Sequence, residues 1–287
     1  MVELNQSTHW VPGFIGEKRF SNWLGNARDW AISRNRYWGS CIPVWINVDD
    51  PEDMLCIGSI EELENLSGKK ITDLHRHYLD DLDIEVNGKT YKRTSEVLDC
   101  WFESGAMPYG QQHYPFENED NFFDGFPADF IAEGLDQTRG WFYTLTVLAV
   151  ALFDSVAFKN CITTGMILAE DGRKMSKSLK NYPDPEELLN SYGGDSLRAY
   201  LINSPVVRGE PLKFSEEGVQ LVTRNIILPL WNSYSFFSTY ANADDISFKD
   251  LEKASPVQDR TMMDRWIISS MQSLSLIHIS EPTRPER

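Results

Sequence analysis

Long apolar runs are missing from the sequence, and so is the usual beginning of a secreted protein. A membrane-spanning helix needs about 20 consecutive apolar residues, whereas the longest apolar stretch, WFYTLTVLAVALF at 141–153, is shorter and predicts a buried helix. The first ten residues, MVELNQSTHW, contain no basic segment followed by an apolar one, so we expect no secretory signal. These absences favour a globular protein of the cytoplasm without a membrane partner.

Cysteine is scarce as well, with four residues in a chain of 287. No two of them have the C-x-x-C spacing of a zinc knuckle or a redox pair, so we expect no tightly bound metal ion. Reduced thiols with a structural role in a cytosolic protein are the expected state. The four are Cys41, Cys56, Cys100 and Cys161.

Basic residues are outnumbered, at 27 against 43 acidic ones, which gives a formal net charge of −16. Most of the acidic excess lies in two stretches, 49–85 and 117–133. The stretch EKRFSNWLGNARDWAISRNR at 17–36 is locally basic, and contact with phosphate depends on local patches rather than on the total. A nucleic-acid partner is therefore compatible with the composition, and so is a basic face exposed to solvent.

The middle of the chain has the element order of a parallel sheet. FPADFIAEG at 126–134 predicts a strand, 141–153 predicts a long helix, and FKNCITTGMILAEDG at 158–172 predicts the next strand. Strands that alternate with helices are typical of an α/β fold with crossover connections. We therefore expect ligands at the carboxyl ends of these strands.

The signals before this region are short and mixed. Residues 1–22 are interpreted as a connecting segment, and residues 22–33 have helical apolar spacing. Residues 41–94 predict a small insert that contains both helix and strand. Its expected elements are a strand at 41–48, a helix over 58–68 with a serine cap and a closing glycine, and a hairpin over 83–94 around Asn87-Gly88.

The signals after the second strand are helical. Asp184 is expected to cap a helix that has Pro185 at its first position, and Gly193-Gly194 separates this helix from the next. Residues 215–242 predict a long amphipathic helix with a kink at Pro229, because proline cannot donate a backbone hydrogen bond.

The stretch AEGLDQTRGW at 132–141 joins the first strand to the long helix. We expect the carboxylate of Glu133 to face a crevice and to bind the ammonium group of a ligand. Gly134 leaves room for a ligand to approach the backbone, and Asp136 and Gln137 offer polar groups at the start of the helix. The alternative, in which Glu133 and Asp136 only cap this helix, fits the same spacing.

The stretch AEDGRKMSKSLKN at 169–181 gathers four basic residues on a loop after the second strand: Arg173, Lys174, Lys177 and Lys180. Ammonium groups on a glycine-hinged loop suit a triphosphate, because they stabilise the charge that develops on phosphoryl oxygens as pyrophosphate leaves. An ordinary exposed basic loop is the alternative. We expect Glu133 and Lys177 to face one shared hollow from neighbouring strand ends.

Four stretches, in order, carry a resemblance to a known family. KMSKS at 174–178 is similar to the second signature of class I aminoacyl-tRNA synthetases. DWAISRNRYWGSCIPVW, LDCWFESGAMPYGQQHYPF and AEGLDQTRGWFYTLTVLAVALF together resemble the isoleucyl-tRNA synthetases, in their cytosolic eukaryotic or archaeal-type branch. The resemblance covers about residues 1–274 and implies the second half of a Rossmann-type parallel-sheet nucleotide-binding domain, followed by an α-helical region.

The resemblance implies an activity and its partners. The enzymes of this family activate isoleucine with ATP, accompanied by Mg²⁺, and transfer it from the adenylate to tRNA(Ile). The full-length protein would be a monomer. Two features of the family are missing here: none of the five histidines lies in the His-x-Gly-His pattern of the first signature, and the editing domain is absent. We therefore expect negligible aminoacylation by this chain alone.

The resemblance also implies roles for individual residues. Glu133 would hold the amino group of isoleucine, and Gly134, Asp136 and Gln137 would line the amino-acid and ribose side. Trp101 and Trp141 would form the walls of the side-chain pocket, since flat indoles measure the width of an aliphatic group; plain core packing is the alternative. Lys174 and Lys177 would be the catalytic residues. The ATP phosphates would meet Lys174, Met175, Ser176, Lys177 and Ser178.

Six parts of the chain follow from the resemblance, and other interpretations stay open. The alternatives are a fragment of a valyl- or leucyl-tRNA synthetase, a non-catalytic tRNA-binding module, and a truncated reading frame without a stable product. The expected parts are a connection from the editing domain (1–40), a small acidic insert (41–94), the second half of the Rossmann catalytic domain (95–170), the signature loop and stem-contact region (171–222), the start of a helical anticodon-binding domain (223–274) and a non-native tail (275–287).

Overall fold

A computed structural model describes residues 1–247, 249 and 254–277 of the chain. The chain divides into two compact units, and the boundary falls between Val219 and Gln220. Among the described residues, every helix is too short or too polar to cross a membrane.

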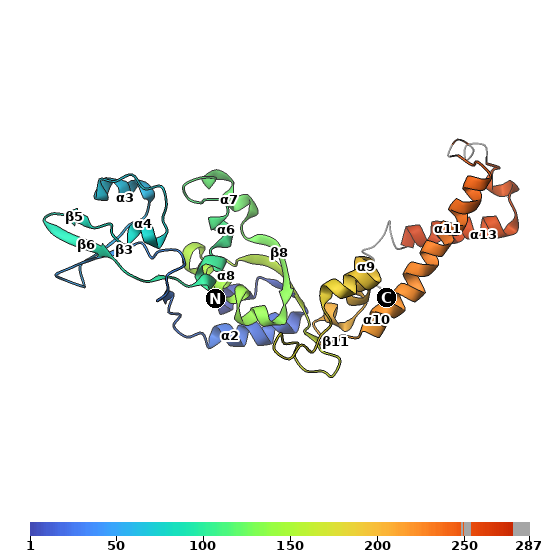
Figure 1. Cartoon of the computed structure of the whole chain (residues 1–287), viewed down its shortest axis with the longest axis horizontal. Coiled ribbons are helices and arrows are strands. Elements are labelled where there is room, and N and C mark those ends of the chain that lie inside the picture. Colours follow the sequence, from blue (N-terminus) through green and yellow to red (C-terminus); the bar gives the residue numbers. More distant parts are fainter. Residues whose placement is uncertain (248, 250–253, 278–287) are drawn as a thin grey trace. The chain divides into compact units, whose positions relative to one another are not determined.

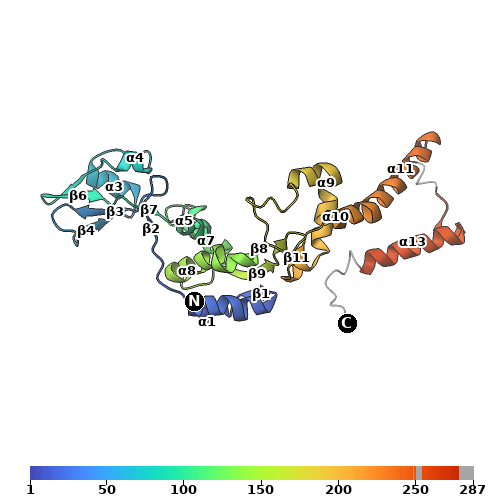
Figure 2. The ribbon, with the colours of Figure 1, turned by 60° about the horizontal axis from the view of Figure 1, so that its bottom comes forward.

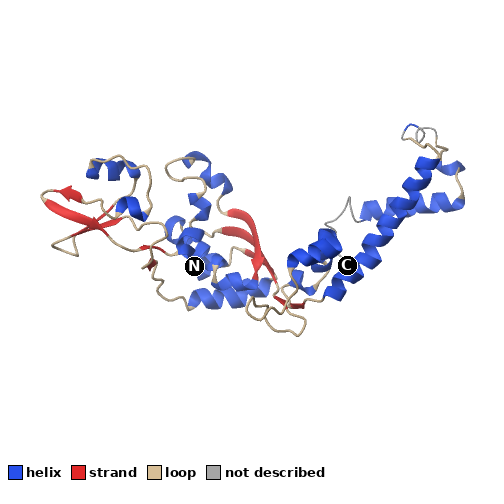
Figure 3. Cartoon of the chain, viewed as in Figure 1, coloured by secondary structure: helices blue, strands red, loops and turns tan. Residues whose placement is uncertain are grey.

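A three-stranded parallel sheet lies in the first unit (Figures 1 and 3). Its strand order is β1-β9-β8, with β1 at His9–Val11, β9 at Phe158–Thr164 and β8 at Ala128–Gly134. The helix α8, Trp141–Phe153, connects β8 to β9. The register pairs Glu133 with Thr163, so the carboxyl ends of β8 and β9 lie side by side. The predicted α/β class and its strand, helix and strand order are confirmed.

Figure 2 shows the crossover helix α8 near β8 and β9. One hydrophobic core holds this helix on the sheet. The ring of Trp10 meets Phe142 and Phe158 edge to face, with centroids 5.8 and 6.0 Å apart. These rings come from β1, α8 and β9, and burial of such large apolar surface is the main term that favours folding. Shorter helices pack around the core or border it: α5 (Cys100–Gly105), α6 (Met107–Gly110), α7 (Glu119–Gly125) and the 3-10 helix η2 (Leu135–Arg139).

The amino-terminal residues 1–22, interpreted above as a connecting segment, belong to this unit and have secondary structure of their own. They form α1 (Val2–Asn5), β1, the π-helical η1 (Ile15–Phe20) and α2 (Ser21–Gly25). β1 pairs in parallel with β9, which lies far away in the sequence. The segment is held in place because Trp10 and Phe20 bury their rings in the core.

The helix predicted over 22–33 is wrong beyond its first residues. α2 ends at Gly25, and the chain then runs without a helix to the strand β2, Ser33–Arg34. β2 pairs with β7, Val97–Leu98, in an antiparallel ladder. The apolar spacing misled because Trp30 does not belong to a helical stripe; its indole N–H donates to Asp99 at 3.0 Å.

The insert forms its own antiparallel sheet with the strand order β4-β3-β6-β5 (Figure 1). The predicted helix is confirmed as α3, Ile60–Ser67: the Ser59 hydroxyl accepts from the Glu62 N–H, and Gly68 closes the helix in the left-handed region. The predicted hairpin is confirmed as β5 and β6. The remaining bounds are β3 (Val44–Asn47), β4 (Met54–Cys56), α4 (Arg76–Leu79), β5 (Ile84–Val86) and β6 (Lys89–Arg93).

Asp53 ties the β3–β4 turn of the insert to β6. Its Oδ2 atom accepts hydrogen bonds from Lys89 at 2.7 Å, from Asn47 at 2.8 Å and from the Tyr91 hydroxyl at 3.0 Å. The hydrogen bond from Lys89, with those from Asn47 and Tyr91, lowers the pKa of Asp53 to about 2. The folded insert therefore stabilises the ionised form of the Asp53 carboxylate.

The stability of the insert is expected to depend on the ionisation of Asp53. Its pKa is depressed on folding, so its contribution is complete above the unfolded pKa of about 3.9 and is lost as the pH falls through about 2. Asp53→Asn should lower the melting temperature at pH 6, and should flatten the decline between pH 5 and pH 2. Melting followed by circular dichroism across this range checks both effects. Equal pH profiles for the two proteins would contradict the assignment.

After the parallel sheet, the chain builds a smaller group of elements within the first unit. The strands β10 (Ile167–Leu168) and β11 (Leu212–Lys213) pair in parallel as a separate two-stranded sheet. The helix α9, Pro185–Ile202, begins at Asp184, whose carboxylate accepts from the Glu186 N–H at 2.8 Å. Gly193 interrupts it with non-helical angles, as predicted. The group also contains η3 (Pro205–Arg208) and the start of α10 (Glu216–Val222).

The second unit is helical. A π-helical turn, η4 (Thr223–Ile227), directly precedes α11 (Leu228–Ala243), which has Pro229 in its first turn. Pro229 has no N–H to donate, and the change of hydrogen-bond pattern lies immediately before it. The other described elements are η5 (Val257–Asp259) and α13 (Met262–Ser275). The prediction of a non-native tail at 275–287 falls mostly on residues 278–287, which lie outside the described residues.

Candidate functional site

The loop between β8 and α8 places four of the predicted site residues next to one another. The Gln137 side-chain oxygen accepts from the Trp141 N–H at 2.9 Å, and its amide nitrogen donates to Asp136 at 3.2 Å. Gln137 therefore satisfies the first N–H of α8, and neither Glu133 nor Asp136 acts as its cap. Within the described residues, the exposed carboxylate of Glu133 has no hydrogen bond or ion pair. It is available to a ligand.

Gly134 has a local reason to be glycine. A Cβ atom at this position would lie 2.7 Å from Oδ1 of Asp136. The missing side chain lets the Asp136 carboxylate fold back over Gly134 at the end of β8. The space predicted for a ligand is thus partly taken by Asp136 itself.

Trp101 and Trp141 lie where α5 meets α8. The Trp141 indole N–H donates to the Ser104 carbonyl at 2.9 Å, which ties the start of α8 to α5. A Cβ atom on Gly140 would lie 3.5 Å from Cη2 of Trp101. Trp141 is half-buried against the core, whereas Trp101 is 44 % exposed. Both predicted residues lie at this junction of α5 and α8, and Trp101 is the one that presents its ring to solvent.

The lysine-rich loop begins with a tight turn. The Gly172 N–H donates to the Ala169 carbonyl at 2.8 Å, and the Ala169 N–H donates to the Arg173 carbonyl at 2.9 Å. Gly172 has a φ of 84°, which favours glycine. The Asp171 carboxylate accepts from Arg173 Nε at 2.7 Å, so Arg173 is committed to the turn itself.

Asn181 holds the two ends of the loop together, and the sequence analysis did not identify it. Its side-chain oxygen accepts from the Ser176 N–H at 2.9 Å, and its amide nitrogen donates to the Lys174 carbonyl at 3.1 Å. The hydroxyl groups of Ser176 and Ser178 are 2.8 Å apart. An Asn several residues after a lysine-rich loop is a common residue in a common place, so spacing alone gave no signal.

Met175 anchors the loop on the protein. Its side chain packs against a small core of Leu188, Phe214 and Val219, while Lys174 and Lys177 are exposed. Within the described residues, neither lysine ammonium group forms an ion pair. The loop therefore presents two unpaired positive charges from a fixed base, which suits a polyanionic ligand.

The strands that connect the parallel sheet to the lysine-rich loop differ from the prediction. The predicted strand over 158–172 is divided into β9 and β10, and β10 pairs with β11 instead of continuing the sheet that contains β8. Glu133 and Lys177 therefore do not lie at the ends of neighbouring strands. A shallow hollow of about 440 Å³ beside the loop is lined by Ala169, Glu170, Asp171 and Asn181, and Glu133 is not among its lining residues. The shared hollow stays a prediction.

Two further observations concern cavities and metal-binding groups elsewhere in the described residues. A cavity of about 650 Å³ lies between the insert and residues 113–116. It is lined by residues that include Trp45, His75 and Phe116, and none of the predicted site residues is among them. Among the described residues, no three His, Cys, Asp or Glu side chains are grouped so that they could hold a metal ion.

Comparison with known proteins identifies the class to which this fold and these loops belong. The profile of the family "tRNA synthetases class I (I, L, M and V)" matches residues 1–213. The chain belongs to this family. Its similarity is to the isoleucine enzymes in particular, as the sequence motifs predicted.

The relatives are similar over nearly the whole of this chain. The isoleucine--tRNA ligase of Chlamydia trachomatis serovar L2 is 56% identical over 274 residues, which are 96% of this chain and 26% of the relative. The cytoplasmic isoleucine--tRNA ligase of Saccharomyces cerevisiae is 57% identical over 278 residues, with the same coverage of 96% and 26%. The chain thus spans about a quarter of the length of these relatives. A solved methionyl-tRNA synthetase of Mycobacterium tuberculosis, in complex with methionyl-adenylate, has a TM-score of 0.48 and 18% identity over 79% of this chain and 35% of its own.

Proposed function

We propose that this chain is part of an isoleucine--tRNA ligase and carries the second half of its catalytic domain. The main support is the identity of 56–57% with isoleucine--tRNA ligases over 96% of the chain. In the proposed reaction, a carboxylate oxygen of isoleucine attacks the α-phosphorus of ATP and pyrophosphate leaves. A hydroxyl of the terminal ribose of tRNA(Ile) then attacks the carbonyl carbon of the adenylate, and AMP leaves.

The loop between β8 and α8 would bind the amino acid, and the lysine-rich loop would bind ATP. The free carboxylate of Glu133 would bind the ammonium group of isoleucine, while Asp136 and Gln137 would line the amino-acid and ribose side. Trp101 and Trp141 would form the walls of the side-chain pocket, with the Trp141 indole fixed by its hydrogen bond to the Ser104 carbonyl. Lys174 and Lys177 would meet the phosphates of ATP, which arrives with Mg²⁺. Their charge is most useful when pyrophosphate departs, since that is when negative charge builds on the phosphoryl oxygens.

The activity is proposed for the longer protein and not for these 287 residues alone. The chain has no His-x-Gly-His signature for the other side of the phosphate site. Residues 1–40 would return the chain from the editing domain to the catalytic domain, and 41–94 would form the small acidic insert. The second half of the catalytic domain would be 95–170, the signature loop and stem-contact region 171–222, and the start of the anticodon-binding domain 223–274. The proposed state of the full-length protein is a monomer in the cytoplasm. The name of the Saccharomyces cerevisiae relative, a cytoplasmic isoleucine--tRNA ligase, supports that location.

A chimeric enzyme tests the proposal directly. Residues 1–274 would replace the matching segment of the Saccharomyces cerevisiae cytoplasmic enzyme, and ATP–pyrophosphate exchange would be measured with isoleucine, valine and leucine. We expect isoleucine-dependent exchange within about tenfold of the yeast enzyme, and negligible exchange by the 287-residue chain alone.

Three outcomes would contradict the proposal. Exchange that prefers valine or leucine would assign the chain to a sister enzyme. A chimera that is folded by circular dichroism but inactive with all three amino acids would remove the catalytic role. A normal rate from the 287-residue chain alone would show that the missing signature is not required.

A further inference from the structure

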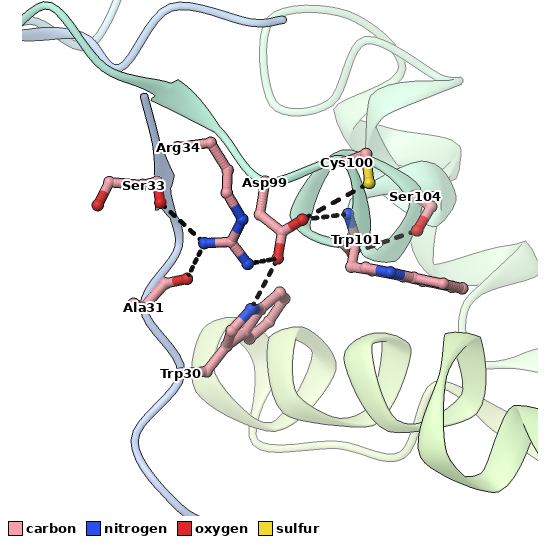
Figure 4. A network of polar contacts seen from close by, with 8 residues as sticks. All are labelled: Trp30, Ala31, Ser33, Arg34, Asp99, Cys100, Trp101 and Ser104. Atoms are coloured by element: carbon pink, nitrogen blue, oxygen red, sulfur yellow. Dashed lines mark hydrogen bonds and ion pairs between the residues drawn. The ribbon is translucent and has the colours of Figure 1, made fainter. Parts of the chain in front are cut away.

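A polar network around the buried Asp99 joins Trp101 to residues that have no assigned role so far (Figure 4). Asp99 immediately precedes α5, and only 3 % of its surface is exposed. Its Oδ2 atom accepts from Arg34 at 2.6 Å and from the Trp30 indole at 3.0 Å. Its Oδ1 atom accepts from the Trp101 backbone N–H at 3.2 Å and faces the Cys100 thiol at 3.6 Å. Both carboxylate oxygens are therefore occupied.

Arg34 is fixed by its own segment as well as by Asp99. Its Nη1 atom donates to the carbonyl groups of Ala31 at 2.6 Å and Ser33 at 2.8 Å. The guanidinium thus links the backbone of its own segment to the Asp99 carboxylate, as Figure 4 shows. Burial of a carboxylate costs free energy unless the group is paired with a positive charge and hydrogen-bonded. Arg34 and Trp30 from one segment, and the Trp101 N–H from another, satisfy both conditions for Asp99.

The ionised form of Asp99 is the one that this network stabilises. Burial alone would raise the pKa of Asp99, but the hydrogen bonds from Trp30 and Trp101 and the charge of Arg34 outweigh it, so the pKa is lowered. The negative charge also lies at the start of α5, where unpaired backbone N–H groups favour an anion. The cap, the ion pair and the indole contact therefore act together.

The residue that this network holds most directly is Trp101. Its backbone N–H is the one that Asp99 caps, and its indole extends from the first turn of α5 towards Gly140. Within the described residues, the indole nitrogen of Trp101 makes no hydrogen bond. The direction of this exposed ring thus depends on where the start of α5 is placed, and Asp99 with Arg34 places it.

We propose that Asp99 and Arg34 are positioning residues that set the distance of the Trp101 indole from the amino-acid side chain, and so the preference for isoleucine over valine. This inference rests on the function proposed above. Discrimination of a single methylene depends on close contact with the pocket wall, so a small displacement of the ring weakens it. Neither residue touches a reacting atom, and the effect should appear in substrate affinity and not in turnover.

Kinetics of variants in the chimeric enzyme test the proposal. Asp99→Asn keeps an acceptor oxygen for the Trp101 N–H but loses the ion pair with Arg34. We expect the KM for isoleucine to rise about tenfold and the preference over valine to fall by a similar factor, while kcat and the KM for ATP stay unchanged. Arg34→Lys keeps the charge but loses the forked contacts, so a smaller effect is expected. Asp129→Asn removes the exposed ion pair with Lys159, at 3.0 Å, and serves as the matched control without effect.

A spectroscopic readout keeps the test independent of activity. In the 287-residue chain labelled with 5-fluorotryptophan, the fluorine resonance of Trp101 is assigned with Trp101→Phe. Asp99→Asn should shift this resonance, and Asp129→Asn should not. If the unmodified chimera shows no isoleucine exchange, the proposed function fails, while the resonance still decides whether Asp99 positions Trp101.

The outcomes that overturn the inference are distinct. An unchanged Trp101 resonance together with an unchanged KM for isoleucine would show that the network does not position the ring. A parallel loss of kcat, ATP affinity and melting temperature would show that Asp99 only stabilises the fold.

Discussion

Replacing Lys177 by alanine in the chimeric enzyme is expected to lower kcat for isoleucine-dependent pyrophosphate exchange by about 100-fold, since removal of one preorganised charge or donor commonly costs this much. Lys177 is exposed and has no ion pair within the described residues, so its charge is not used by the fold. The charge is needed only as pyrophosphate leaves. The KM for isoleucine should therefore change little, and steady-state exchange kinetics separate the two parameters.

Two further variants serve as controls for the Lys177→Ala result. Lys177→Arg keeps a positive charge on the same loop and should recover part of the lost rate. Lys70→Ala removes an exposed lysine of the insert and should leave the rate unchanged. A rate for Lys177→Ala within twofold of the unmodified chimera would exclude a role in phosphate stabilisation.

Replacing Gly165 by alanine is expected to destabilise the chain by about 3 kcal/mol, which is a large effect for one methyl group. A Cβ atom at this position would lie 1.8 Å from the carbonyl oxygen of Glu210, and the neighbouring atoms that it would meet are also backbone. The Gly165 N–H in addition donates to the Val206 carbonyl at 2.7 Å. No side chain is available to move aside, so the backbone between β9 and β10 would have to shift.

The measurement is thermal or urea unfolding of the 287-residue chain, with Gly110→Ala as the control. A Cβ atom on Gly110 would meet nothing within 4 Å, so its melting temperature should stay close to that of the unmodified chain. Gly165→Ala should lower the melting temperature by roughly 10 °C. Because this glycine precedes β10 and the lysine loop, the chimera should also lose activity. A Gly165→Ala chain as stable as the control would contradict the close approach.

Several parts of the fold follow from short stretches of sequence. Ser59 and Gly68 at the ends of α3, Asn87-Gly88 in the hairpin, and Asp184 with Pro185 at the start of α9 all form the predicted elements. Each signal acts within a few residues, through a side-chain cap or a left-handed turn. The residues of the two site loops were likewise identified by their order and type, and their assigned roles stay predictions.

Other parts were predicted wrongly because their partners are distant. The segment of β1 gave no strand signal of its own, yet it pairs with β9, and its residue Trp10 belongs to the core. Trp30 has helical spacing, but its indole binds a carboxylate 69 residues further on. The long run over 158–172 was predicted as one strand, whereas it forms β9 and β10 in separate sheets, and the backbone of Glu210 approaches Gly165 between them.

The sequence by itself determined the family, the local elements and the residues available for chemistry, because these depend on residue types at fixed short spacings. Only the tertiary structure decided that Asp99 joins Arg34 to Trp101, that Asn181 closes the lysine loop, and that β10 leaves the main sheet for β11. Those contacts form when segments far apart in the chain are buried together, and the free energy of that burial is a property of the whole fold and not of any one stretch.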